Sequence, residues 1–393
     1  MTNRHSAWAL RPGVTYLNHG SFGPSPLPVI EAREEWARRL EAEPMDFFVR
    51  LLEDELERVA DRLGNFVGAA GDDLLLVPNA TVAMNLVAAN VSLGPGDQVL
   101  TTNHEYGAVQ RIWREVCRHS GAELVVRRLP KFLDEDQPIV DALMAGATKR
   151  TRLIVVSHVT SPTALILPVE AICRAARERK IPVCIDGPHA PAMVDVNIRV
   201  LGCDYYCASL HKWISAPFGS GFLYVARKRQ QAFRPQIVSW GGSMAGRERS
   251  WKDEFTWHGT HDPSPLLAIP AALDFLDDGG LEQFREHARG LVKLARREIT
   301  ALTNLEPLHS DSPSRQGTMI SLPLPPLPDF EGGHGRTDPL QQWLWDQRRI
   351  EIPIHHWGGG RFLRISCHLY NTDEDITRLR DAVALGLGLR VEG

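Results

Sequence analysis

The chain alternates short apolar runs with amphipathic stretches from about residue 73 to residue 224, and this alternation constrains the fold more than any other feature. In the amphipathic stretches the apolar residues recur at three and four positions, as in helices that cover a core. Strands that alternate with helices favour a mostly parallel sheet with helices on both faces. We therefore expect strands at 97–102, 123–129, 152–159, 181–185, 205–208 and 221–225, and helices at 81–91, 108–120 and 169–180.

The pattern changes after about residue 265. There we expect helices at 266–276, 281–302 and 373–387 and strands at 316–322 and 361–366, with a proline-rich loop of extended backbone at 323–328. This order indicates a smaller α+β domain. The predicted organisation is therefore an amino-terminal arm at 1–20 that packs on the small domain, a large domain at 21–265 and a small domain at 266–393.

The composition excludes several classes of function. The 393 residues are 43% hydrophobic and 23% charged, with a net charge of −4, which is ordinary for a soluble globular protein. A weakly acidic chain has no electrostatic preference for nucleic acid or for anionic lipid. No apolar run approaches the length of a membrane span, and residues 1–8 contain no apolar core of signal-peptide length, so we expect a cytoplasmic protein. The six scattered cysteines predict reduced core thiols and no structural metal.

Polar clusters follow four of the apolar runs, at 79–81, 157–163, 186–189 and 209–212. Ligands of parallel sheets collect at the carboxyl ends of the strands, so these clusters are expected to meet. Two of them contain Lys212, in Ser209-Leu-His-Lys212-Trp, and Asp186, in Asp186-Gly-Pro-His189. A lysine that forms a Schiff base and a carboxylate that keeps a pyridine nitrogen protonated are the two groups that pyridoxal phosphate requires.

Other residues complete this interpretation. Asn79-Ala80-Thr81 opens a helix whose free amides suit a phosphate, although the same residues also form plain helix caps. Ser209 and His211 flank the lysine and are candidates for the same phosphate. Tyr106 follows another strand and is placed to stack on a pyridine ring, and His189 to bond the phenolic oxygen of that ring.

Arg364, in Arg361-Phe-Leu-Arg364-Ile-Ser, lies on an expected strand between apolar residues. A buried guanidinium must be paired or must face a cavity. It therefore either binds the carboxylate of an amino-acid substrate or forms an internal salt bridge.

In their order along the chain these motifs resemble the class V group of pyridoxal-phosphate enzymes, of aminotransferase-like fold type I. The resemblance extends from Tyr16-Leu-Asn-His-Gly-Ser-Phe-Gly23 to Tyr370-Asn-Thr-Asp373. It implies a large α/β domain with a mostly parallel, seven-stranded type of sheet, a smaller α+β domain, pyridoxal 5'-phosphate as cofactor and a homodimer.

The resemblance also implies roles for individual residues. Lys212 would carry the cofactor and shuttle a proton, and Asp186 would face the ring nitrogen. Thr260 would reach a phosphate across the dimer interface. Ser161 stands where many relatives carry an asparagine. The other residues expected at the cofactor are Ala80, Thr81, Tyr106, His189, Ser209 and His211, and those expected at the substrate are Asn18, His19, His355, His356 and Arg364.

The bond that breaks is a separate question, because the cofactor alone does not determine it. The expected loop at 353–360 has no cysteine, and Cys367 follows Arg364 on the expected strand, which disfavours a persulfide-forming desulfurase. Within the family, four segments resemble isopenicillin N epimerase and its relatives: Tyr16-Leu-Asn-His-Gly-Ser-Phe-Gly, Glu105-Tyr-Gly-Ala, Ser157-His-Val-Thr-Ser-Pro-Thr and Gly259-Thr-His-Asp-Pro-Ser-Pro. This resemblance implies an epimerase, for which Lys212 would be one base and His355, His356 or Tyr370 the donor on the opposite face. A carbon–sulfur β-lyase, an aminotransferase and a catalytically silent binding protein are the alternatives.

Overall fold

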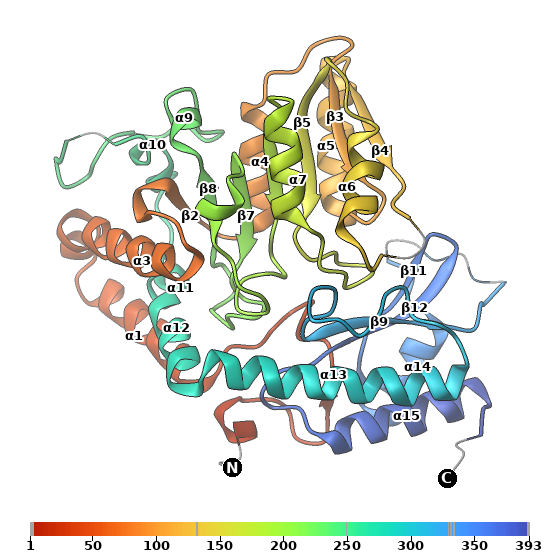
Figure 1. Cartoon of the computed structure of the whole chain (residues 1–393). Coiled ribbons are helices and arrows are strands. Elements are labelled where there is room, and N and C mark those ends of the chain that lie inside the picture. The colour runs from red at the N-terminus through yellow and green to blue at the C-terminus, as the bar shows by residue number, and fades with distance from the viewer. Residues whose placement is uncertain are drawn as a thin grey trace.

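The computed structural model describes residues 4–130, 133–248, 250–328, 330, 332 and 335–390. Two main sheets organise these residues (Figure 1). The larger has seven strands in the order β2-β8-β7-β6-β5-β3-β4, and only β8 runs antiparallel to its neighbours. This confirms the predicted mostly parallel sheet. Its strands are β2 (Leu74–Val77), β3 (Gln98–Thr102), β4 (Glu123–Arg127), β5 (Thr151–Ser157), β6 (Val183–Asp186), β7 (Tyr205–Ser209) and β8 (Gly221–Val225).

The central strands of the large sheet are buried on both faces, as expected for a parallel sheet with helical crossovers, whereas the edge strand β4 has exposed residues. Successive residues of β5 alternate between two apolar clusters, with Val155 in one and Ile154 in the other. The cluster of Val155 includes residues of α4 (Ala80–Asn90) and α5 (Gly107–Ser120). The cluster of Ile154 includes residues of α6 (Asp136–Met144) and α7 (Val169–Glu178) and continues into the other sheet.

The smaller sheet is antiparallel, in the order β11-β12-β9. Its strands are β11 (Ile354–Trp357), β12 (Gly360–Ser366) and β9 (Met319–Leu324). Figure 1 shows α13 (Leu281–Thr303) lying along α15 (Asp373–Leu387) beside this sheet, and α13 contacts both β9 and α15. In addition, β1 (Thr15–Tyr16) pairs in parallel with β10 (Ile350–Glu351), which joins the amino-terminal segment to the small sheet's region.

Of the remaining helices, α14 packs against α15 and β10. α1 and α3 pack against α11 and α12. Their bounds are α1 (Leu27–Ala42), α2 (Pro44–Asp46), α3 (Leu52–Val67), α8 (Ile198–Leu201), α9 (Arg227–Gln230), α10 (Asp253–Thr256), α11 (Ser264–Leu267), α12 (Ile269–Gly279) and α14 (Pro339–Arg348).

Three expected elements differ in the structure. The helix expected at 266–276 is divided into α11 and α12, because Pro270 in the first turn of α12 has no N–H to continue the preceding helix. The strand expected at 316–322 runs into the proline-rich stretch, where Pro323 pairs with Phe362. Proline is tolerated there because β9 is an edge strand. Finally, the loop expected at 353–360 is a hairpin, with β11 antiparallel to β12.

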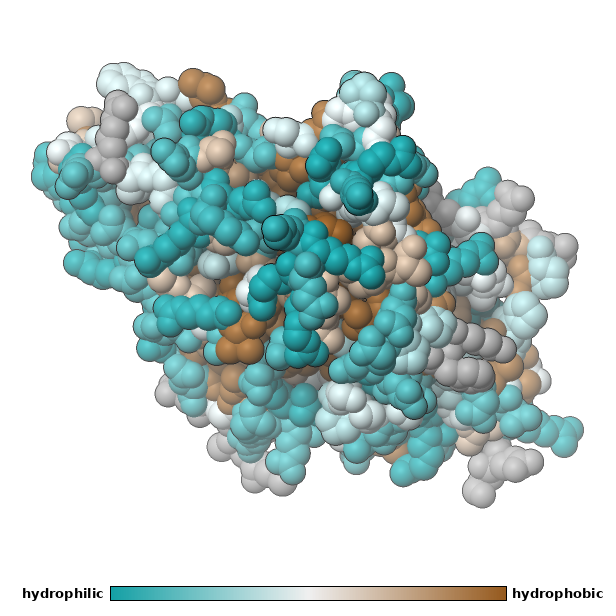
Figure 2. Space-filling view, turned by 45° about the horizontal axis from the view of Figure 1, so that its top comes forward, coloured by the Kyte–Doolittle hydropathy of each residue, from teal (hydrophilic) through white to brown (hydrophobic). Residues whose placement is uncertain are grey.

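The surface drawn in Figure 2 is mostly hydrophilic, with apolar side chains exposed in separate patches between charged ones. Within the described residues, no helix is both long and apolar enough to cross a membrane.

Candidate active site

A cavity of about 400 Å³ lies at the carboxyl ends of β5, β6 and β7 and is closed from the other side by β11 and β12. It brings together residues that are far apart in the sequence, as predicted from the strand ends. The predicted site residues that line it are Ala80, Thr81, Tyr106, Ser161, Asp186, His189, Ser209, His211, Lys212, His355 and Arg364.

The first turn of α4 forms one wall of the cavity. The side chain of Asn79 caps the helix by accepting a hydrogen bond from the Val82 amide at 3.0 Å. The Ala80 amide donates to Oγ of Ser209 at 2.9 Å, which ties this helix start to the strand end that precedes Lys212. A helix start with nearby hydroxyl and imidazole groups provides donors and a positive dipole end for a phosphate.

Lys212 extends from the loop after β7 into the cavity, where its Nζ lies 2.9 Å from Nε2 of His189. Burial, together with the positive charge of Arg364, lowers the pKa of the Lys212 amine to about 7, although Asp186 opposes this shift. Burial raises the pKa of Asp186 to about 6, against the effect of Lys212. A large fraction of the amine is therefore neutral near pH 7, which is the form that attacks an aldehyde.

A second buried carboxyl group, Glu105, lies behind the Asp186 strand end, and no pattern in the sequence singled it out. It accepts hydrogen bonds at 2.6 Å from Thr102 and from Ser157, the residue that pairs with Asp186 across the sheet. Burial raises the pKa of Glu105 to about 7 despite these two bonds. The only sequence feature that could have pointed to Glu105 as a site residue is its position directly before Tyr106.

Arg364 is 2% exposed and enters the cavity from β12. Its guanidinium donates to the backbone oxygen and to Oγ of Ser161, at 2.9 and 3.0 Å, and to Oγ of Ser21 at 2.5 Å. None of the carboxylates in the described part of the chain forms a salt bridge with it. The internal salt bridge considered from the sequence is therefore absent among these residues, and the positive charge is available to an anionic ligand.

The β11 strand separates the two adjacent histidines, because successive side chains of a strand point to opposite faces. His355 lines the cavity, and burial lowers its pKa to about 3. His356 instead lies 2.8 Å from Asp338, which also accepts two hydrogen bonds from Arg361. Only the first histidine of the pair is therefore placed to contact a ligand in the cavity.

Four predicted site residues do not line this cavity. Asn18 donates to Glu351 at 3.4 Å, and His19 is fully buried beneath Lys212. His356 is bound to Asp338, and Thr260 is exposed on the segment after α10. The cavity residues that were not selected from the sequence include Ser21, which contacts Arg364, and Phe22, which is 65% exposed.

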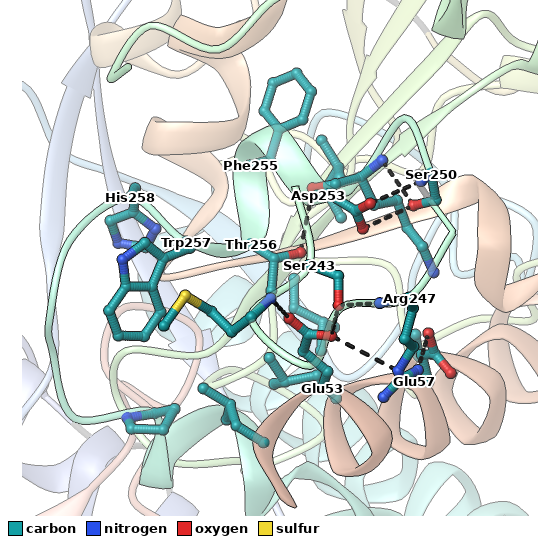
Figure 3. Close-up of a pocket in the computed structure, with 18 of the residues that line it drawn as sticks. Glu53, Glu57, Ser243, Arg247, Ser250, Asp253, Phe255, Thr256, Trp257 and His258 are labelled. Carbon is teal, nitrogen blue, oxygen red and sulfur yellow. Dashed lines mark hydrogen bonds and ion pairs between the residues drawn. The ribbon is translucent and has the colours of Figure 1, made fainter. Parts of the chain in front are cut away.

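The segment that carries Thr260 is held on α3 around a second cavity, shown in Figure 3. Ser243 donates to Glu53 at 2.6 Å, and Arg247 forms ion pairs with Glu53 and Glu57, at 3.6 and 2.7 Å. Trp257 lines the same cavity. These contacts hold Ser243 and Arg247 on α3, whereas three apolar side chains that precede them in the same segment are highly exposed: Ile237 (58%), Val238 (82%) and Trp240 (86%).

The main cavity fits pyridoxal phosphate in the types of groups that it presents. It has an anion site at α4, a buried amine with a lowered pKa, and a buried carboxyl group close enough to affect that amine. In addition, Nδ1 of His189 is buried without a hydrogen-bond partner in the described structure. Among the described residues there is no cluster of side chains that could hold a metal ion.

Comparisons with known proteins agree with this site. The Aminotransferase class-V family matches residues 15–379. Isopenicillin N epimerase of Amycolatopsis lactamdurans is 37% identical over 96% of this chain and 98% of that protein. A putative L-cysteine desulfhydrase of rice (Oryza sativa subsp. japonica) is 28% identical over 94% of this chain and 83% of that protein.

Among solved structures, the fold is similar to that of a C-DES mutant with glycine covalently linked to its PLP cofactor. The TM-score is 0.83 at 21% identity, over 98% of this chain and 99% of that one. With the family match over most of its length, the chain belongs to the class-V aminotransferases, a family of pyridoxal-phosphate enzymes of fold type I.

Proposed function

We propose that this protein is a pyridoxal-phosphate-dependent epimerase or racemase that acts at the α-carbon of an amino acid or an amino-acid derivative. The observation that carries this proposal is the placement of Lys212, Asp186 and Arg364 around one cavity, with a neutral amine accessible near pH 7. The 37% identity to an isopenicillin N epimerase favours this reaction over others of the family.

Each of these side chains has a specific task in such a reaction. When bound, the cofactor supplies an electron sink that acidifies the α-proton. Arg364 binds the substrate carboxylate, which orients the α-carbon toward Lys212. Lys212 accepts the α-proton on its own face of the substrate. Asp186 holds a proton on the ring nitrogen by placing a negative charge beside it.

Inversion also requires a group on the opposite face. Of the three side chains considered from the sequence, His355 lines the cavity. His356 is bound to Asp338, and the Tyr370 hydroxyl lies 2.9 Å from Nδ1 of His19 in the interior. We therefore propose His355 as the group on the opposite face. Because burial lowers its pKa to about 3, the ring is neutral near pH 7 and would have to take up a proton before it could donate one to the α-carbon.

The cysteines of the chain support an epimerase over a desulfurase. All six are buried, and none of them lines the cavity. Burial raises the pKa of the Cys367 thiol far above its usual value, so this side chain stays protonated and unreactive.

A carbon–sulfur lyase is the second candidate, favoured by the 28% identity to a putative desulfhydrase.

Substrate candidates are screened in D₂O by the spectral shift of the cofactor, and product chirality is then measured. Epimerisation predicts deuterium at the α-carbon of both stereoisomers without release of pyruvate. Release of stoichiometric pyruvate and ammonia would instead identify a lyase. Amino transfer that depends on an added keto acid would identify an aminotransferase. Protein that binds no cofactor and has no visible band would be a silent binding protein.

We further infer a homodimer in which Thr260 reaches the partner's phosphate site, and we retain a cytoplasmic location as a prediction from the sequence. The exposed Ile237, Val238 and Trp240 on the same segment support a partner surface. The test mixes Lys212→Ala and Thr260→Ala chains. If sites are shared, each mixed dimer has one intact site, so the mixture should be more active than the mean of the two variants measured separately. No recovery in mixed dimers of verified composition would refute the sharing.

A further inference from the structure

His19 is completely buried below the cavity, directly under the backbone of Lys212. Its Nε2 lies 2.9 Å from the carbonyl oxygen of Lys212, and its Nδ1 lies 2.9 Å from the hydroxyl of Tyr370. These contacts join three distant parts of the chain, since His19 is in the amino-terminal segment and Tyr370 follows β12. A residue outside the cavity thus links the lysine to the small sheet.

The direction of both hydrogen bonds follows from the chemistry of the groups. A carbonyl oxygen can only accept, so Nε2 of His19 must carry the proton and donate to Lys212. Burial lowers the pKa of His19 to about 3, so the ring is neutral and Nδ1 is an acceptor. The Tyr370 hydroxyl therefore donates to Nδ1 and fixes the tautomer in which the ring bonds the lysine backbone.

The surrounding packing leaves this imidazole little freedom. It stacks on His368 with 4.1 Å between ring centroids and on Trp213 at 5.4 Å. A Cβ added at Gly23 would lie 2.5 Å from its Nε2, so a side chain at that position would displace the ring. On the other side, the Ser215 amide donates to the same Lys212 carbonyl at 2.8 Å, from a residue with φ of +58°.

We propose that His19 is a positioning residue, held in one tautomer by Tyr370, that fixes the backbone of Lys212 and thereby the placement of its amine. This role rests on the proposed function, in which Lys212 is the Schiff-base residue. It replaces the expectation that His19 binds substrate. Asn18 has no part in this connection, because its side chain donates to Glu351.

Two substitutions of His19 separate the two hydrogen bonds. In His19→Gln the amide nitrogen takes the place of Nε2 and can still donate to Lys212. In His19→Asn the side-chain amide takes the place of Nδ1, so the contact with Tyr370 remains and the bond to the lysine is lost. Tyr370→Phe removes the donor that fixes the tautomer. His309→Gln is the control, because His309 is buried and lies 2.9 Å from a backbone carbonyl, that of Ser310, outside the cavity.

The measurement is the absorbance band of the Schiff base that forms when pyridoxal phosphate is added to cofactor-free protein, followed in rate and across pH. We expect His19→Asn to slow band formation about tenfold and to move its apparent pKa by about half to one unit, the equivalent of one hydrogen bond. His19→Gln and the His309→Gln control should stay within about twofold of the wild type, and Tyr370→Phe should fall between.

Two outcomes would overturn this role. If His19→Asn forms the band like the wild type, the bond to Lys212 positions nothing. If the Asn and Gln variants lose band formation and melting temperature equally, His19 only supports the fold. If the His19→Asn variant does not fold, the positioning role is tested by comparing the rate of band formation in His19→Gln and Tyr370→Phe with that of the wild type. A wild-type protein without a band at Lys212 would instead refute the proposed function, so the two failures are distinguishable.

Discussion

Replacing Arg364 with glutamine should weaken substrate binding and leave the fold equally stable or more stable. The guanidinium is 2% exposed and has three hydrogen bonds to neutral oxygens, but no carboxylate partner among the described residues. Burial lowers its pKa to about 10. The shift from the usual 12.5 corresponds to a cost of about 3 kcal/mol at neutral pH, which the substitution removes. Loss of the bonds to Ser21 and Ser161 offsets part of this gain.

Whereas the Arg364→Gln substitution should not destabilise the fold, it should weaken the binding of the substrate. A bidentate contact of Arg364 with a carboxylate consists of two charge-assisted hydrogen bonds and contributes about 3–4 kcal/mol. Its removal should therefore raise the KM for an amino-acid substrate about 100- to 1000-fold. Cofactor affinity should change much less, because the groups proposed to hold the cofactor lie at the strand ends of the large sheet and at the start of α4.

Arg361→Gln is the matched control on the same strand. Arg361 bonds the buried Asp338 at 2.8 and 2.7 Å, and its removal leaves a carboxylate buried with a histidine as its remaining ion-pair partner. This variant should lose about 3–5 kcal/mol of unfolding free energy without a specific rise in KM. Denaturant unfolding and steady-state kinetics on both proteins test the pair. A normal KM for Arg364→Gln, or a loss of cofactor as large as the rise in KM, would refute the assignment.

Three further predictions concern the ionisable groups. The rate at which cofactor-free protein forms the Schiff base should rise with pH through about 7, since the Lys212 amine loses its proton there; a rise only near 10 would contradict its burial. Asp186→Asn should keep its circular dichroism spectrum but lose turnover at least about 100-fold. Because burial raises the pKa of the Glu105 carboxyl to about 7, the stability of the wild type relative to that of Glu105→Gln should fall by up to about 3 kcal/mol as pH rises from about 4.5 to 7; the other buried groups, such as Asp186, titrate in both proteins and cancel in this difference.

The sequence was sufficient for six of the seven strands of the large sheet because their signals are local, whereas β2 was not among the expected strands. A central strand such as β5 is a short apolar run, and its polar continuation marks the carboxyl end where ligands bind. The residues at these ends, among them Lys212 and Asp186, could therefore be predicted to share one cavity. The α15 helix was also predicted with its bounds, since Thr372 and Asp375 form a capping box at its start.

What the sequence did not reveal depends on contacts between distant segments. His19 and Lys212 are 193 residues apart, and no local pattern shows that a histidine lies under a lysine. The same holds for Glu105, which is recognised as a buried acid only after Ser157 is placed beside it. His355 and His356 were both expected at the substrate for another reason: the segment was taken as a loop. In a strand, the side chains of adjacent residues point to opposite faces, so only one of the two can face the cavity.

The most direct test of the central claim is reduction of the holoenzyme with borohydride followed by mass-spectrometric peptide mapping. The placement of a buried, partly neutral amine beside Asp186 predicts that the pyridoxyl group is found on Lys212, and that the visible band disappears on reduction. A pyridoxyl group on another lysine, or protein that binds no cofactor at all, would contradict the site described.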